Sequence, residues 1–192
     1  MIADDPVAAF EALPRRLFLD SSTLQAVLQY GEFIFENVEP PATARGLQLP
    51  GFRDELEALQ AILQVNQRAM LDVAISENSL REIADKQDAR YLSWALDVRD
   101  HWRTRIAEHE GRAFTGADVG QAVRLDGGAF GYLSAKDKAL LKDALACESD
   151  AFLTMDRRLA RNAPALRAAV GIQVLRPVDY WAVLRPWAAL YL

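Results

Sequence analysis

Four short apolar segments, separated by stretches with helical spacing, limit the folds that this chain can adopt. The apolar segments cover about residues 13–20, 70–76, 150–156 and 171–177. Apolar residues recur at helical intervals over residues 21–35, 52–69, about 88–109, 134–149 and 155–170. Strands that alternate with helices favour a parallel sheet with helices on both faces. We therefore expect an α/β fold, namely a three-layer α/β/α sandwich around a central, mainly parallel sheet of four to five strands.

Length and composition indicate an ordinary globular protein. The chain has 192 residues, of which 51% are hydrophobic and 26% are charged, so we expect one domain over residues 1–192 with a sizeable core. Residues 38–51 contain several prolines and glycines and predict a loop. Cys147 is the single cysteine, which suits a reducing compartment. It lies on an apolar helix face and is expected to pack as a small buried side chain.

The amino terminus and the hydropathy pattern bear on location. Residues 1–14 are acidic and lack the basic segment and the apolar segment of a secretory signal. Every apolar run falls short of the roughly 20 residues that a membrane span needs. We therefore predict a cytoplasmic protein with no membrane partner.

Charge is unevenly distributed along the sequence. The formal net charge is -5, which argues against nonspecific coating of DNA. Arginines nevertheless gather in the middle of the chain and near its end, at Arg90, Arg99, Arg103, Arg105, Arg112, Arg124, Arg157, Arg158 and Arg161. Either group could form a solvated helix face, or a surface that contacts phosphate through the forked donors of its guanidinium groups.

Two acidic residues directly end predicted strands. Asp20 closes the segment LPRRLFLD and Asp156 closes DAFLTMD, so both are expected at the carboxyl ends of parallel strands, where active sites form. Carboxylates gathered there repel one another unless a cation neutralises them. Each could instead simply cap the helix that follows it. Glu82 and Asp137 lie on predicted helices, where they could be a solvated residue and a first-turn acid favoured by the helix dipole.

Three segments together resemble the motifs of PIN-domain ribonucleases, in particular the VapC-like toxin type. LFLDSSTL resembles the first motif, with Asp20 as its acid and Ser22 two residues later. AISENSLREI resembles the second motif, in which a helix after a strand carries a glutamate, here Glu82. KDKALLKDALACESDAFLTMDRRL resembles the third motif, in which Asp137 opens a helix and a Thr-x-Asp sequence ends in Asp156.

The resemblance implies a PIN-like fold and a metal-dependent mechanism. Members of this family hold one or two Mg²⁺ or Mn²⁺ ions, and hard oxygen ligands suit these ions. The implied activity is that of an endoribonuclease that hydrolyses RNA phosphodiester bonds, and the toxin type implies an antitoxin protein as partner. The implied catalytic and metal-binding residues are Asp20, Glu82, Asp137 and Asp156, supported by Ser22 and Thr154, which orient the carboxylates.

Two further acids are alternatives within these motifs. Asp143 lies six residues after Asp137 on the same predicted helix, a net rotation of about 240°, so the two cannot share one helix face. Asp137 is nearer the helix start and is preferred, with Asp143 in reserve. Glu77 lies closer to the end of its strand than Glu82 and is the reserve for that position.

Other functions compete with the nuclease. A catalytically silent PIN-like module that binds RNA or protein would keep the acids without the activity. A haloacid-dehalogenase-type phosphatase also begins with a strand that ends in aspartate, but it needs a second aspartate where this chain has Ser22. The sequence contains neither zinc-ligand spacing nor a phosphate-binding loop with Lys-Ser/Thr.

Two segments lie outside the motifs. Residues 83–133 are expected to form an enlarged helical and loop insertion relative to the compact toxins. Residues 176–192 form an aromatic carboxyl-terminal extension that contains Tyr180, Trp181, Trp187 and Tyr191. These rings could pack back onto the sheet or a neighbouring helix, or they could anchor a homodimer or another partner.

Overall fold

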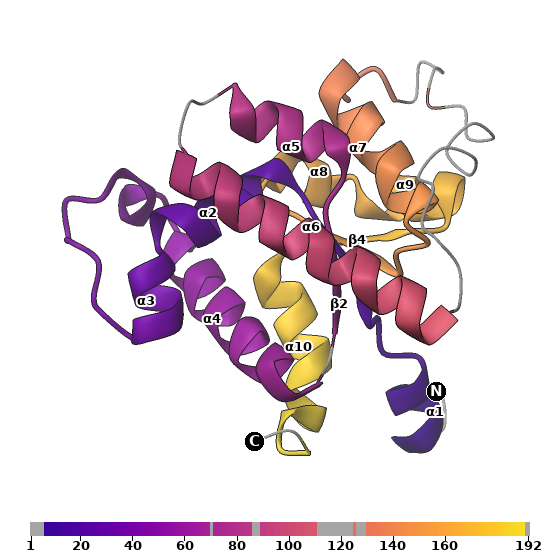
Figure 1. The fold of residues 1–192 in the computed structure, drawn as a ribbon, viewed down its shortest axis with the longest axis horizontal. Coiled ribbons are helices and arrows are strands. Elements are labelled where there is room, and N and C mark those ends of the chain that lie inside the picture. Colours follow the sequence, from indigo (N-terminus) through magenta and orange to yellow (C-terminus); the bar gives the residue numbers. More distant parts are fainter. Residues whose placement is uncertain (1–5, 70, 86–88, 111–124, 126–129, 191–192) are drawn as a thin grey trace.

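The protein folds around a parallel sheet (Figure 1). The computed structural model describes residues 6–69, 71–85, 89–110, 125 and 130–190. In this part of the chain the sheet has four strands in the order β2-β1-β3-β4, and each neighbouring pair is parallel. Along the chain the elements are α1 (Pro6–Glu11), β1 (Arg16–Leu19), α2 (Ser21–Gln29), α3 (Gly31–Glu36), η1 (Arg45–Gln48), α4 (Phe52–Ala69), β2 (Asp72–Ala74), α5 (Glu77–Ala84), α6 (Ala89–Glu110), α7 (Ala135–Ala146), β3 (Ala151–Leu153), α8 (Arg157–Arg161), α9 (Ala163–Val170), β4 (Gln173–Leu175) and α10 (Pro177–Ala188).

Successive residues of the strands join two different hydrophobic clusters, one on each face of the sheet. In β1, Leu17 and Leu19 belong to the first cluster and Phe18 to the second, because side chains alternate across a strand. Phe18 stacks on Phe152 of β3 with a centroid distance of 5.5 Å. Helices α2 to α6 and α10 contribute to the first cluster, and α7 to α9 contribute to the second. The predicted α/β class and parallel sheet are confirmed, and the layering is consistent with an α/β/α sandwich.

Two of the predicted helices are each divided in two. Residues 21–35 form α2 and α3, which meet at Tyr30 with φ -118° and ψ 25°, next to Gly31, whose flexibility disfavours a continuous helix. Residues 155–170 form α8 and α9, which are separated at Asn162. Pro164 lies in the first turn of α9, where its missing N–H is tolerated, whereas inside one long helix it would remove a hydrogen bond.

The strands are shorter than the apolar segments that predicted them, and residues that flank the strands make hydrogen bonds between the strand ends. Asp150 precedes β3, and its Oδ2 accepts hydrogen bonds from the backbone N–H groups of Arg15 and Arg16 at 2.9 and 2.8 Å. This carboxylate therefore ties the start of β3 to the start of β1. At the carboxyl ends of the same two strands, the N–H of Asp20 donates to the carbonyl of Leu153 at 3.0 Å.

Two local predictions from the sequence are confirmed. Ser134 caps α7, since its hydroxyl accepts a hydrogen bond from the backbone N–H of Asp137. Cys147 is buried in the second cluster, and burial raises the pKa of its thiol to about 12. The thiol is therefore a packed core group and not a nucleophile at neutral pH.

The carboxyl-terminal aromatic residues pack back onto the protein. Tyr180 is fully buried, and its hydroxyl donates to the carbonyl of Pro14 at 2.7 Å. Trp187 meets the ring of Phe10 edge to face at 5.3 Å. Helix α10 lies alongside α4 (Figure 1). Packing, rather than a free interface, thus accounts for Tyr180 and Trp187, while Tyr191 lies outside the described residues.

The predicted insertion at residues 83–133 is described only in part. Its long helix is present as α6, whereas most of the glycine-rich stretch, with Arg112 and Arg124, lies outside the described residues. Among the helices that the structure describes, none combines the length and hydropathy of a membrane span.

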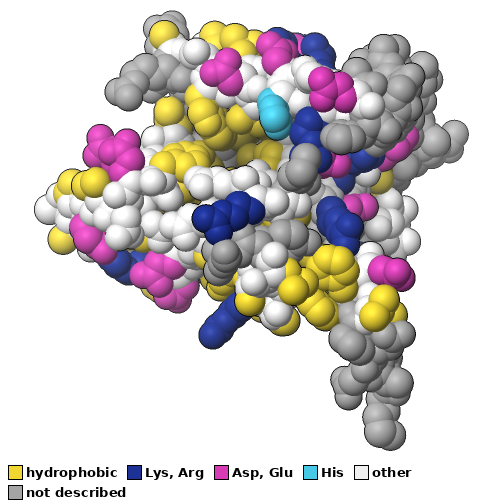
Figure 2. All heavy atoms as spheres, turned by 60° about the horizontal axis from the view of Figure 1, so that its bottom comes forward, with side chains coloured by type: hydrophobic (Ala, Val, Ile, Leu, Met, Phe, Trp, Pro, Cys, Tyr) yellow, Lys and Arg dark blue, Asp and Glu magenta, His cyan; other side chains and the backbone are white. Residues whose placement is uncertain are grey.

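A hollow lined by hydrophobic side chains opens on the face shown in Figure 2. It has a volume of about 670 Å³ and lies between α4 and α6, where its lining includes Leu63, Val73, Trp94 and His101. Acidic and basic side chains are interspersed elsewhere on this face. The coloured part of this view therefore presents no continuous basic surface.

Glu55 is a buried carboxylate that joins α4 to α10. It is 4% exposed, accepts a hydrogen bond from the N–H of Val178 at 3.1 Å and pairs with Arg176 at 3.1 Å. Burial raises the pKa of Glu55 above its ordinary value, although the Val178 hydrogen bond and the charge of Arg176 oppose this effect. The folded protein therefore binds a proton at Glu55 more readily than the unfolded chain.

This raised pKa predicts a measurable pH dependence of stability. The contribution of Glu55 is fully present below the ordinary glutamate pKa of 4.5 and is lost as the pH rises through the raised pKa. The quantity to measure is the unfolding free energy of wild type minus that of Glu55→Gln, obtained from denaturant titrations. We expect this difference to fall as the pH rises from about pH 4 to about pH 8. Glu57→Gln, an exposed glutamate on the same helix, is the matched control. A difference that rose with pH would contradict the assignment.

Candidate active site

Asp20 stands at the carboxyl end of β1, beside the end of β3. It is only 6% exposed. Although it directly precedes α2, its carboxylate makes no capping hydrogen bond to that helix. Its Oδ2 instead accepts hydrogen bonds from the hydroxyls of Ser22 and Thr154, both at 2.6 Å. Helix capping therefore does not account for Asp20, and both predicted supporting residues contact it.

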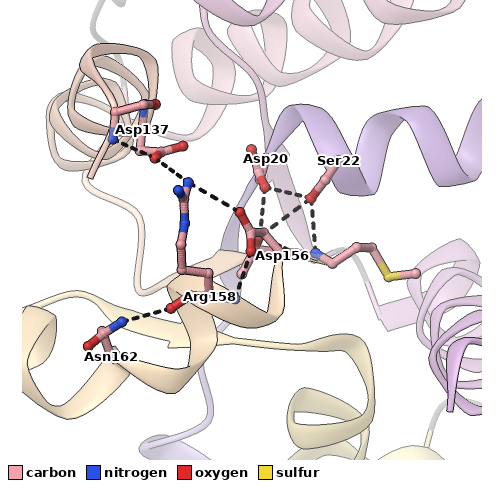
Figure 3. Close-up of polar contacts among 9 residues, drawn as sticks. Asp20, Ser22, Asp137, Asp156, Arg158 and Asn162 are labelled. Carbon is pink, nitrogen blue, oxygen red and sulfur yellow. Dashed lines mark hydrogen bonds and ion pairs between the residues drawn. The ribbon is translucent and has the colours of Figure 1, made fainter. Parts of the chain in front are cut away.

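The two hydroxyl groups are themselves fixed by the backbone after β3 (Figure 3). The N–H of Met155 donates to Ser22 Oγ at 3.1 Å, and the N–H of Asp156 donates to Thr154 Oγ1 at 3.0 Å. Each hydroxyl thus accepts from the backbone and directs its own hydrogen to Asp20. The network joins the end of β1 to the end of β3.

The surroundings of Asp20 disfavour its charge. Burial raises the pKa of Asp20, the hydrogen bonds from Ser22, Thr154 and the Ser21 backbone lower it, and the nearby charge of Asp137 raises it further. The net shift is upward. Within the described part of the chain no basic side chain pairs with Asp20. A cation bound here would favour the charged form.

Arg158 lies between Asp137 and Asp156 (Figure 3). Its Nη2 is 3.1 Å from Asp137 Oδ2 and 3.7 Å from Asp156 Oδ2. Both acids also accept hydrogen bonds from backbone N–H groups at the starts of α7 and α8. Asp137 Oδ2 accepts from the N–H of Ser134 at 2.8 Å, and Asp156 Oδ1 accepts from the N–H of Arg158 at 2.7 Å. Two acids from different helices therefore share one cationic group.

Glu82 approaches the same region from α5. Its Oε2 accepts a hydrogen bond from Ser21 Oγ at 2.8 Å, and its Oε1 is 3.9 Å from Lys136 Nζ. Ser21 directly follows Asp20, and Lys136 directly precedes Asp137. Glu82 is thus bound to the neighbours of two other predicted acids.

The two reserve acids are engaged with other partners. Glu77 pairs with Arg99 and Arg103 of α6 at 3.2 and 2.7 Å. Asp143 Oδ2 accepts from the side-chain amide of Asn78 at 2.8 Å. In the part of the chain described, neither shares a hydrogen bond or ion pair with Asp20 or with Arg158. The geometry favours Asp137 over Asp143 and Glu82 over Glu77.

The donors at this edge suit a hard cation in their chemistry. Carboxylate and hydroxyl oxygens are the ligands that Mg²⁺ and Mn²⁺ prefer. As the side chains lie, however, no three acidic, histidine or cysteine residues of the described chain are close enough to hold one ion together. At Asp137 and Asp156 the guanidinium group of Arg158 lies between the two carboxylates. A cation that binds both acids has to replace it.

Ser21 and Lys136, which contact Glu82, were not identified from the sequence as residues of this site. Arg158 was named only among the arginines of a solvated face or a phosphate-contacting surface, and not as a partner of the acids. One signal pointed to Arg158. A basic residue in the first turn of a helix is unfavourable with the helix dipole, so an acidic partner near that position was to be expected.

Comparison of the chain with models of known protein families, with curated proteins and with solved structures gives no match. What the site can do therefore follows from its own residues.

The Asp20 network predicts the effect of removing one hydroxyl. Thr154→Val keeps the side-chain shape but removes a donor to buried Asp20 and an acceptor for the N–H of Asp156. We expect the unfolding free energy to fall by about 1–3 kcal/mol, measured by urea denaturation in the presence of a chelator. Thr43→Val, at an exposed loop position, should change it by less than about 0.5 kcal/mol. Equal effects of the two substitutions would show that the network contributes no stability.

Proposed function

We propose that the protein is a Mg²⁺- or Mn²⁺-dependent endoribonuclease with a PIN-like fold. One observation carries the proposal. Asp20 and Asp156 follow adjacent parallel strands, and the Thr154 hydroxyl joins the Asp20 carboxylate to the backbone N–H of Asp156, while the negative charge of Asp137 acts on Asp20. Carboxylates gathered at one end of a sheet repel one another, and a bound cation would relieve this repulsion. A cation-binding edge of this kind supports phosphodiester hydrolysis best among the functions that the sequence suggested.

The roles of the residues follow from their contacts. In this proposal Asp20, Glu82, Asp137 and Asp156 bind the cation, and Ser22 and Thr154 hold the Asp20 carboxylate in one orientation. When bound, Mg²⁺ or Mn²⁺ supplies activation of water and neutralises charge that develops on the phosphodiester. Ser21 positions Glu82, since its hydroxyl donates to that carboxylate.

The phosphatase alternative is disfavoured at Ser22. That chemistry needs a general acid two residues after the first aspartate, whereas the Ser22 hydroxyl donates to Asp20 and accepts from the N–H of Met155. The toxin role, an antitoxin partner, a homodimer and the cytoplasmic location stay predictions from the sequence.

The decisive experiment is a nuclease assay on single-stranded and structured RNA with Mg²⁺, with Mn²⁺ or with chelator. We expect cleavage with either metal and none with chelator. Ser22→Ala removes a residue that only orients Asp20 and should reduce the rate by at most about 100-fold. Asp20→Asn removes a proposed metal ligand and should reduce the rate by more than that. Binding of Mn²⁺ without any cleavage would instead identify the catalytically silent module.

Two matched pairs of variants test which acids belong to the site. Asp137→Asn and Asp143→Asn make the same change on one helix, and Glu82→Gln and Glu77→Gln do so on another. We expect the first member of each pair to lose activity as Asp20→Asn does, and the second to keep activity within about tenfold of wild type. The reverse order within either pair would reassign that position.

Arg158 should compete with the bound cation. Because the arginine is half exposed, its ion pairs contribute at most about 1 kcal/mol. We therefore expect Arg158→Ala to tighten Mn²⁺ binding by up to about fivefold, measured by calorimetry without substrate. Arg167→Ala removes an exposed arginine from α9 and should leave the affinity unchanged. Weaker Mn²⁺ binding by Arg158→Ala would show that the arginine supports the cation site.

A further inference from the structure

Three arginines line a pocket beside the candidate active site. The pocket has a volume of about 450 Å³ and is lined by Arg157, Ala160, Arg161, Arg176 and Asp179. Arg176 directly follows β4, the strand that neighbours β3. The pocket therefore lies at the same edge of the sheet as the acids that follow β1 and β3.

Helix α8 separates this pocket from the acids. Its N-cap is Asp156, and Arg158 points to Asp137 and Asp156 (Figure 3). Arg157 and Arg161 are four residues apart, which places them on one side of a helix. One short helix thus directs one arginine to the acids and two arginines to the adjoining pocket.

The charges in the pocket are only partly balanced. Arg176 pairs with Glu55 at 3.1 Å and with Asp179 at 3.0 Å. Arg157 donates to the carbonyl of Pro50, a neutral acceptor, and Arg161 is exposed. Among the residues that the structure describes, neither Arg157 nor Arg161 forms an ion pair with an acid. Two guanidinium groups consequently line the pocket without a carboxylate in direct contact.

We propose that this pocket binds a backbone phosphate of the RNA strand, next to the phosphodiester that lies at the acids. Arg157 and Arg161 donate to the phosphate oxygens, because the forked guanidinium group matches this acceptor and charge assistance strengthens each bond. The inference rests on the proposed function for the identity of the strand. The net charge of the chain is -5, but charges are screened beyond about 10 Å in moderate salt, so nearby arginines can attract a polyanion to this part of the surface.

The test is the salt dependence of RNA binding without cleavage. Fluorescence anisotropy follows a labelled single-stranded RNA oligonucleotide on Asp20→Asn protein with Mg²⁺, and on wild type with chelator. Adding Arg157→Ala and Arg161→Ala should weaken binding by about tenfold for each charge-assisted hydrogen bond removed. The slope of log affinity against log salt should become shallower by about 0.7 for each phosphate that the variant no longer binds.

Arg167→Ala is the matched control, because it removes an exposed arginine of α9 that does not line the pocket. It should leave both affinity and slope unchanged. Equal effects of the pocket variants and of Arg167→Ala would overturn the proposal, since they would indicate general charge attraction only.

Competition with inorganic phosphate shows whether the pocket binds free phosphate or a phosphate of the RNA backbone. Inorganic phosphate should compete with the oligonucleotide on the parent protein and compete much less on the double variant. Phosphate binding to the pocket together with unchanged RNA affinity in the double variant would make this a site for free phosphate and overturn the RNA assignment.

The same variants distinguish failure of the pocket from failure of the nuclease. If they weaken RNA binding but wild type cleaves no RNA with any metal, the pocket is supported and the nuclease is refuted. If wild type cleaves RNA and the double variant does so with an unchanged KM, the nuclease is supported and the pocket is refuted.

Discussion

The buried carboxylate of Asp20 is the constraint on which the carboxyl edge of the sheet depends. A buried charge is costly unless hydrogen bonds satisfy it, and Ser22 and Thr154 provide two short ones. Both hydroxyls are held by backbone N–H groups that follow β3. The pairing of β1 with β3 therefore also determines where Asp156 lies relative to Asp20. A shift of register between these strands would separate the acids and break the network together.

Helix capping and cation binding are compatible uses of the same acids. Asp137 and Asp156 each accept a hydrogen bond from a backbone N–H at the start of a helix. The same bonds fix where the carboxylates point, toward the guanidinium group of Arg158. Of the simpler interpretations, helix capping is confirmed for Asp156, and Asp137 lies in the first turn of α7 as expected. Asp20 differs from them, because its carboxylate makes no capping hydrogen bond to α2 and is held mainly by the hydroxyls of Ser22 and Thr154.

The sequence located the acids that follow strands better than those on helices. All strands of a parallel sheet end on the same side, so the positions of Asp20 and Asp156 directly after predicted strands placed both at the carboxyl end of the sheet without knowledge of packing. The breaks inside two predicted helices also have signals in the sequence, namely Pro164 for the break at Asn162 and Gly31 for the break at Tyr30. Contacts such as Ser21 with Glu82 join residues 61 positions apart, and they depend on how α5 packs beside α2. Such contacts become visible only in three dimensions.

The three arginines of α8 place positive charge both at the acids and at the neighbouring pocket, because Arg158 contacts Asp137 and Asp156 while Arg157 and Arg161 line the pocket. Charges are screened beyond about 10 Å in moderate salt, so a phosphate at the site responds to neighbouring groups and not to the net charge of the chain. Without a divalent cation, Arg158 offsets the charge of Asp137 and Asp156. A cation that takes over this role leaves the Arg158 guanidinium group free beside Arg157 and Arg161. In the proposed enzyme, cation binding therefore removes repulsion at the acids and adds positive charge where the RNA strand runs, so the two ligands favour each other.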